Sequence, residues 1–196
     1  MYSHKVYQYA QNKVVNVCTS CECVDNFGEW NYNQAVNVSL IKSCSFFGHR
    51  EIEVTKELKQ KLKKVLKDKI EKEGFEVFYF GGFGMFDDLC WEIITELKTE
   101  FPYIKRVFCL YDQRHLRASK RPRNLSKDNF EEFVYFDLEF DWWYKRIYFR
   151  NIAIIDKSDF VVFYVKNKKS SGAYKIFEYA IKKKKSLINI SVDKWF

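Results

Sequence analysis

After about residue 38, strand-like and helix-like segments alternate along this chain, and this alternation constrains its fold more than any other feature. Short runs rich in β-branched and aromatic residues predict strands, and longer segments with apolar residues at helical spacing predict helices. The predicted strands cover 38–47, 76–80, 106–111, 159–165 and 187–192, and the predicted helices cover 53–73, 88–98, 143–155 and 173–184. Alternation of this kind favours a parallel sheet covered on both faces. With right-handed crossovers, the expected fold class is α/β: a Rossmann-like, doubly wound, mainly parallel five-stranded sheet with helices on both faces.

Other segments fit this alternation less well. Residues 1–37 show poor periodicity, so we expect an irregular N-terminal extension before a single Rossmann-like domain at 38–196. The polar and basic segment 112–129 contains Pro122 and reads as a long loop. Residues 130–151 are aromatic and acid-rich, with an uncertain strand near 133–136.

Composition narrows the possible functions. An apolar content of 47% indicates a folded globular protein. No apolar run approaches a membrane span and no signal-peptide pattern opens the sequence, so we expect a cytoplasmic protein with no membrane partner. Cys18, Cys21 and Cys23 include one Cys-x-x-Cys pair, whereas a structural zinc site takes four ligands. We therefore expect no metal site and no cofactor.

The formal net charge of +8 suits nucleic acid, an anionic surface or a phosphorylated ligand. Much of the excess lies in 56–72 and 182–185, where lysines usually form the solvated face of a helix, so nucleic acid is not the favoured partner. The aromatic cluster Trp142-Trp143-Tyr144 favours packing or an interface, and it leaves room for a homo-oligomer.

A glycine-rich turn, Gly81-Gly82-Phe83-Gly84, lies between a predicted buried strand and a predicted helix. Glycine lets backbone N–H groups approach a ligand closely because no Cβ intervenes. The amino end of a helix adds N–H donors and partial positive charge, and anions bind there. The turn therefore suits a phosphate, although a tight turn with no ligand explains the same pattern.

Further polar groups follow the ends of the other predicted strands. Gly48-His49-Arg50 follows the first strand, Tyr111 ends the third, and Ser170-Ser171-Gly172 follows the fourth. Ligands of doubly wound sheets bind outside the carboxyl ends of the strands, at the point where strand order reverses. The candidate ligand-binding residues are Gly48, His49, Arg50, Gly81, Gly82, Gly84, Phe86, Asp87, Tyr111, Arg150, Asn151, Ser170, Ser171, Gly172, Ala173 and Tyr174.

With these motifs the chain resembles the SLOG superfamily, the SMF/DprA and LOG group of Rossmann-like proteins. Within it the chain is similar to the YpsA-like branch, whose first strand ends in a Gly-His-Arg motif. The stretches that carry the resemblance are Phe46-Phe47-Gly48-His49-Arg50, Gly81-Gly82-Phe83-Gly84-Met85-Phe86-Asp87, Arg150-Asn151, Ile155-Asp156-Lys157-Ser158-Asp159, Ser170-Ser171-Gly172-Ala173 and Tyr179-Ala180. The resemblance covers about residues 39–190.

The resemblance implies a nucleotide or nucleotide-derived ligand, bound by a sensor module or by an enzyme. The enzymes of the group are phosphoribohydrolases, N-glycosidases that release a base from a nucleoside monophosphate. LOG-type enzymes carry an arginine, matched by Arg150, and a Pro-Gly-Gly-x-Gly-Thr loop followed closely by a glutamate. Here Ser171-Gly172-Ala173 replaces most of that loop, and the glutamate's position falls near Ile176, two residues before Glu178. We therefore expect a nucleotide-binding protein, with N-glycosidase activity as the alternative.

Individual residues leave alternative roles open. Arg50 can bind a phosphate in bidentate fashion or pair with a nearby acid, and His49 can bind the ligand or the backbone. Asp87 either bonds ribose hydroxyls or caps its helix. Arg150 either reaches the cleft or pairs with Glu139 or Asp141.

The residues after the later strands also have two possible roles each. Ser170 and Ser171 can bond phosphate oxygens, and Ser171 can also cap the final helix. Tyr111 stacks on a base or simply ends its strand, and Tyr174 can cover the ligand.

Overall fold

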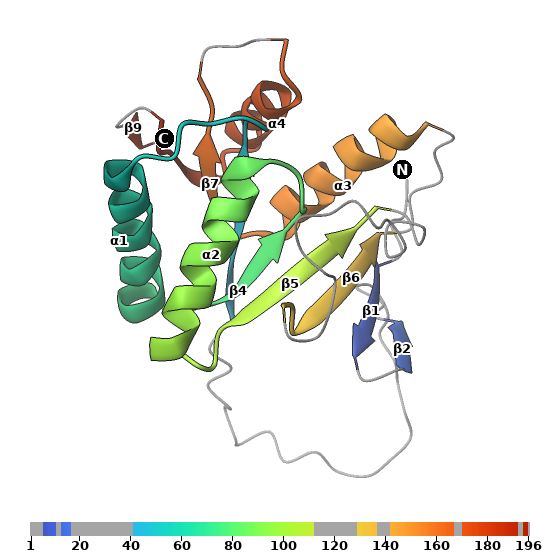
Figure 1. Cartoon of the computed structure of the whole chain (residues 1–196). Coiled ribbons are helices and arrows are strands. Elements are labelled where there is room, and N and C mark those ends of the chain that lie inside the picture. The colour runs from blue at the N-terminus through green and yellow to red at the C-terminus, as the bar shows by residue number, and fades with distance from the viewer. Residues whose placement is uncertain are drawn as a thin grey trace.

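The structure is a computed structural model that describes residues 6–10, 13–16, 41–111, 129–136, 142–166, 170–191 and 194–195. In these residues one sheet is flanked by helices on both faces (Figure 1). The elements are β1 (Val6–Ala10), β2 (Lys13–Asn16), β3 (Lys42–Gly48), α1 (Lys56–Glu73), β4 (Phe75–Phe80), α2 (Met85–Glu100), β5 (Lys105–Leu110), β6 (Glu132–Phe136), α3 (Trp143–Lys157), β7 (Phe160–Tyr164), α4 (Gly172–Lys182), β8 (Ser186–Asn189) and β9 (Lys194–Trp195).

The sheet confirms the predicted fold class and corrects the number of strands. Its order is β2-β1-β6-β5-β4-β3-β7-β8-β9, and the inner six strands, β6 to β8 in that order, are parallel. We predicted five, and β6 is the sixth. Of its five residues only Val134 and Phe136 are buried, so its apolar signal is weaker than that of the fully buried strands.

We expected residues 1–37 to be irregular, but the structure describes two strands in this segment. β1 pairs antiparallel with β6, the outermost strand of the parallel part of the sheet, and β2 pairs antiparallel with β1. An edge strand presents unpaired N–H and C=O groups, which an extended segment can satisfy whatever its local pattern. Pairing over such a sequence separation leaves no local signal, which is why the sequence did not reveal it. The other residues of 1–37 lie outside the described part of the chain.

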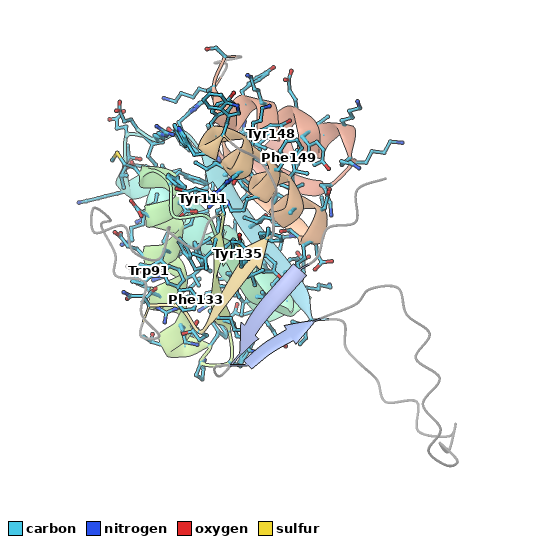
Figure 2. The ribbon with its side chains drawn as sticks, turned by 90° about the vertical axis from the view of Figure 1, so that its right-hand side faces the viewer. Trp91, Tyr111, Phe133, Tyr135, Tyr148 and Phe149 are labelled. Atoms are coloured by element: carbon cyan, nitrogen blue, oxygen red, sulfur yellow. The ribbon has the colours of Figure 1, made fainter. Side chains whose placement is uncertain are left out.

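The helices cover the sheet in two pairs. α1 and α2 pack on one face around Leu62, Phe80 and Ile93, and α3 and α4 pack on the other around Ile154 and Phe177. Figure 2 shows the same division, with Trp91 on the α2 side of the sheet and Tyr148 and Phe149 on the α3 side. Both faces are therefore buried, as the apolar strands required.

Strand order reverses beside β3. From β3 the chain moves outward through β4, β5 and β6, then crosses back to β7 on the other side of β3 and continues to β8. The connections on the two sides of β3 therefore leave in opposite directions, which opens a crevice at the carboxyl ends of β3 and β7. Among the described residues, no helix is long and apolar enough to cross a membrane.

Candidate functional site

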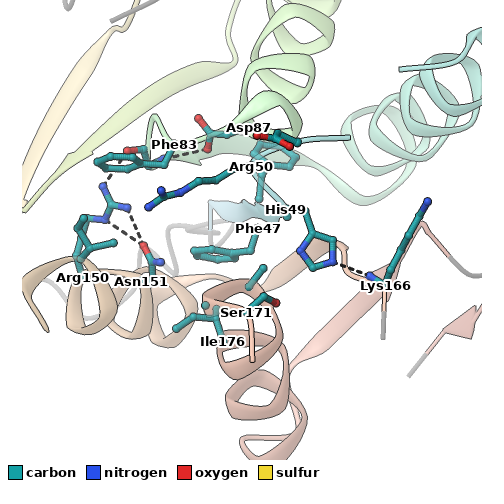
Figure 3. Close-up of a pocket in the computed structure, with 17 residues that line it drawn as sticks. Phe47, His49, Arg50, Phe83, Asp87, Arg150, Asn151, Lys166, Ser171 and Ile176 are labelled. Atoms are coloured by element: carbon teal, nitrogen blue, oxygen red, sulfur yellow. Dashed lines mark hydrogen bonds between the residues drawn. The ribbon is translucent and has the colours of Figure 1, made fainter. Parts of the chain in front are cut away.

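A pocket of about 600 Å³ lies at the carboxyl ends of β3, β4 and β7, where strand order reverses (Figure 3). Most of the predicted site residues line it: Gly48, His49, Arg50, Gly81, Asp87, Arg150, Asn151, Ser171, Gly172 and Ala173. The sequence missed Phe46, Phe47, Glu51, Phe83, Ile147, Lys166 and Ile176, which also line it. A cavity of this size can enclose a nucleoside monophosphate.

The remaining predicted residues do not line this pocket: Gly82, Gly84, Phe86, Tyr111, Ser170 and Tyr174. Phe86 is fully buried, and its ring packs 5.6 Å from that of Tyr164. A Cβ on Gly48 would lie within 2.7 Å of the Phe86 side chain, so β3 and α2 meet in close contact there. Phe86 is thus a core residue, which corrects its assignment as a ligand contact.

The glycine-rich turn is filled by a side chain of the protein itself. The Asp87 carboxylate accepts hydrogen bonds from the Gly81 N–H at 3.2 Å and from the Gly82 N–H at 2.9 Å. Asp87 therefore neither caps α2, whose N-cap is Gly84, nor leaves these two amides for a phosphate. The expected phosphate cradle on Gly81 and Gly82 needs correction, because a carboxylate already occupies it.

Asp87 is only 5% exposed, yet it contributes to the pocket wall. Burial raises the pKa of its carboxyl to about 6, against the opposing effects of the Gly81 and Gly82 amides and of the Arg150 charge. The carboxyl is therefore mostly ionised at neutral pH and is held rigidly by the turn.

The buried side chain of Arg150 connects the ends of two strands. Its Nη1 donates to the Gly81 carbonyl at 2.8 Å and to the Cys109 carbonyl at 3.1 Å, and its Nε and Nη2 donate to Asn151 Oδ1. The guanidinium carbon lies 5.4 Å from the Phe83 ring centre and 5.8 Å from that of Tyr111. Arg150 thus fixes the ends of β4 and β5 and lines the pocket. Glu139 and Asp141, which we considered as its partners, lie outside the described residues.

Arg50 differs from Arg150 in both exposure and contacts. It is exposed, and Figure 3 shows its side chain extending over the pocket between Phe83 and Phe47. Among the residues that the structure describes, its side chain has no hydrogen-bond or ion-pair partner. Its carbonyl accepts the Met85 N–H at 2.8 Å, so its backbone is anchored to the start of α2 while its charge points into the cavity.

His49 joins β3 to the segment after β7. Its N–H donates to the Tyr164 carbonyl at 3.2 Å, and its Nε2 accepts the Lys166 N–H at 3.0 Å. The backbone bond that we had set against a ligand role is therefore present. Because Nε2 accepts, the neutral ring carries its proton on Nδ1 and keeps one donor. His49 also brings Lys166 to the pocket edge.

The amino end of α4 forms the opposite wall. Ser171 Oγ accepts the Tyr174 N–H at 3.1 Å, so Ser171 caps the helix as one of its two predicted roles required. The next amides, of Gly172 and Ala173, have no acceptor within the described chain, and both residues line the pocket. Figure 3 places Ser171 on the side of the pocket opposite Asp87.

The apolar part of the lining consists mainly of Phe47, Phe83, Ile147 and Ile176. Ile176 is 1% exposed and fills the place where the LOG-type glutamate was expected, whereas Glu178 is exposed and does not line the pocket. The helical spacing of Ile147 with Arg150 and Asn151 is a signal that could have placed Ile147 at the site. Phe47 ends the predicted strand 38–47 and Lys166 follows the predicted strand 159–165, so their position at the carboxyl ends of strands could have found them.

Two other predictions can be compared with the structure. On α1, Lys59 and Lys63 pair with Glu96, and Lys67 pairs with Glu100 on α2, so part of the lysine-rich face is neutralised. Trp142 and Trp143 are each 60% exposed, so of the two roles that we favoured, core or interface, they do not take the core role. An interface between copies of the chain remains a prediction for them.

The described residues contain no group of three or more His, Cys, Asp or Glu side chains placed to hold a metal ion. Cys18, Cys21 and Cys23 lie outside the described part of the chain. Cys44, Cys90 and Cys109 are buried, and burial raises the pKa of Cys109 to about 12, so it carries no reactive thiolate.

No protein-family model matches the chain, and no curated protein matches it significantly. Among solved structures, DNA processing protein A (DprA) from Streptococcus pneumoniae superposes with a TM-score of 0.54 at 14% identity, covering 75% of this chain and 49% of that one. The structural-genomics target TM1055 covers 75% of this chain and 72% of its own, with a TM-score of 0.47 at 15% identity. The match to DprA thus spans about half of that protein. It shows that this chain has the Rossmann-like fold of DprA, the fold that the SMF/DprA resemblance predicted.

Proposed function

We propose that this protein binds a nucleotide or a nucleotide derivative in the pocket at the reversal of strand order. The observation that carries the proposal is the Arg50 guanidinium, which extends into a pocket of about 600 Å³ without a partner in the described residues. An arginine held over a cavity is suited to a phosphate, which its planar fork can bind through two hydrogen bonds.

The phosphate is assigned to the wall formed by Arg50 and the start of α4. The Gly172 and Ala173 amides and the positive end of the helix dipole favour an anion there. Lys166 and His49 add a cation and a donor at the same edge. Glu51 also lines the pocket, and its negative charge opposes an anion, but it is exposed and therefore screened.

The base is assigned to the apolar part of the pocket. Phe47, Phe83, Ile147 and Ile176 provide the aromatic and aliphatic contacts that nucleobases favour. Binding rather than hydrolysis is the function that these residues support best. The α4 wall offers Ile176 where a phosphoribohydrolase would hold its glutamate, and Arg150 is committed to backbone carbonyls.

Calorimetric titration with AMP, GMP, CMP, UMP and ADP-ribose tests the proposal, with adenosine and inorganic phosphate as partial ligands. We expect at least one nucleotide to bind, and Arg50→Ala to weaken it at least about tenfold, since a hydrogen bond to a charged group contributes about 1.5–3 kcal/mol. Binding of the phosphate-free nucleoside should not change in this variant.

Lys182→Ala is the matched control, because Lys182 is an exposed cation of α4 that does not line the pocket. It should change nucleotide affinity less than about twofold, the range expected for a screened charge outside the site. Absence of binding by every nucleotide at millimolar concentration would refute the proposal. Equal losses in Arg50→Ala and Lys182→Ala would place the ligand elsewhere.

A further inference from the structure

We propose that Asp87 binds the ribose hydroxyls of the ligand and makes the pocket selective for nucleotides that carry both the 2′ and the 3′ hydroxyl. This inference rests on the proposed function, because it assigns an orientation to the nucleotide within the same pocket. It starts from Asp87, an acceptor-only group that lines the pocket opposite the donors at the start of α4.

Asp87 has acceptor capacity left over. An ionised carboxylate offers about four lone-pair sites, and the Gly81 and Gly82 amides use one on each oxygen. The side chain is 5% exposed and lines the pocket. A ligand that displaces water from this wall must therefore bring hydrogen-bond donors, because a buried carboxylate left without them costs free energy.

A phosphate does not suit this wall. A phosphate beside the Asp87 carboxylate would be repelled by it, because two like charges at short range in a partly buried wall are poorly screened. Arg50 and the start of α4 already provide an anion site, and Figure 3 places Ser171 and Asp87 on opposite sides of the pocket with Arg50 between them. The phosphate and the carboxylate are therefore kept apart if the nucleotide spans the cavity.

The ribose is the part of a nucleotide whose donors match Asp87. Its 2′ and 3′ hydroxyls form a pair of neighbouring O–H donors, which suits the two oxygens of one carboxylate. The turn amides hold Asp87 in place, so no side-chain freedom is lost when the hydroxyls bind. Exocyclic amino groups of bases are also donors, and the test below separates them from the hydroxyls.

The test compares AMP, GMP, CMP and UMP with their 2′,3′-dideoxy counterparts in calorimetric titrations of the wild-type protein. We expect the dideoxy compound to bind at least about tenfold more weakly than the ribonucleotide for every base that binds. Asp87→Asn should reduce that ratio to less than about threefold, whereas Arg50→Ala should weaken both compounds equally and leave the ratio unchanged.

An NMR measurement on the wild-type protein tests the same inference without the Asp87→Asn variant, in case that variant folds poorly. The amide resonances of Gly81 and Gly82 report on the Asp87 carboxylate and should shift with the ribonucleotide but not with its dideoxy counterpart. Equal binding of the two compounds overturns this inference and leaves the proposed function standing. A ratio that persists in Asp87→Asn, or affinities that follow base amino groups instead of hydroxyls, overturns it too. No binding by any nucleotide overturns both.

Discussion

The two arginines of the pocket illustrate how much the partners of a side chain decide its role. Arg150 is 2% exposed and donates to the carbonyls that end β4 and β5, whereas Arg50 is exposed and points into the cavity. Both were candidate ligand contacts in the sequence. The structure indicates that Arg150 positions the pocket walls and that Arg50 is available to an anion.

Replacing Arg150 should therefore lower the stability of the protein. Arg150→Met leaves the Gly81 and Cys109 carbonyls without their buried donor, and we expect the free energy of unfolding to fall by about 3 kcal/mol or more. Lys157→Met, an exposed change on the same helix, should stay within about 0.5 kcal/mol. Urea denaturation measures both. An Arg150→Met variant with wild-type stability that had lost only ligand binding would contradict this structural role of Arg150.

Asp87 should give stability a specific pH dependence. Its folded-state pKa of about 6 lies above the ordinary value of 3.8, so folding favours the protonated carboxyl. This contribution is fully present below about pH 4 and is lost as the pH rises through 6, a change of up to about 3 kcal/mol. Relative to Asp87→Asn, the wild type should gain stability as the pH falls from 7 to 4. Parallel pH profiles in urea denaturation would show that burial does not raise this pKa.

At the scale of single elements, the helix starts show best how local sequence sets the site. The cap of α4 by Ser171 was readable from the sequence, because a serine before an amphipathic segment is a common N-terminus signal. The start of α2 was not. There Gly84 adopts a φ of 96°, and its backbone meets that of Arg50. Such a contact between two segments far apart in the chain leaves no local pattern.

Gly84→Ala should consequently be much more damaging than Gly172→Ala. At position 84 a Cβ would lie 2.7 Å from the Arg50 Cα and would also face an unfavourable positive φ. We expect a loss of at least about 2 kcal/mol in unfolding free energy. At position 172 nothing lies within 4 Å, so the same substitution should be neutral or stabilise by up to about 1 kcal/mol. Equal effects of the two substitutions in urea denaturation would contradict this contact.

At the scale of the whole molecule, the sequence predicted the parallel α/β fold and both helix layers. It also indicated the carboxyl ends of the strands, where the pocket lies. These features follow from periodicity and from the rule that places ligands where strand order reverses. It did not reveal β1 and β2 at the sheet edge, nor the Asp87 carboxylate within the glycine turn. Both depend on pairings between groups that a local pattern does not connect.

The Asp87 contact matters most for the account of the whole pocket. We predicted from the sequence that the glycine turn at Gly81 and the loop at Ser170 hold the phosphate together, and the structure gives the glycine amides to Asp87. Our proposal therefore assigns the anion to the Arg50 and α4 side of the pocket and no longer to the glycine turn. Strand ends could be located from the sequence, but the partner of each polar group at those ends could not.

A crystal structure of the protein with a bound nucleoside monophosphate tests this orientation most directly. Our account predicts the phosphate beside the Arg50 guanidinium and the amides of Gly172 and Ala173, with Asp87 still accepting from Gly81 and Gly82. A phosphate seated on the Gly81 and Gly82 amides with Asp87 displaced, or a nucleotide bound outside this pocket, would contradict it.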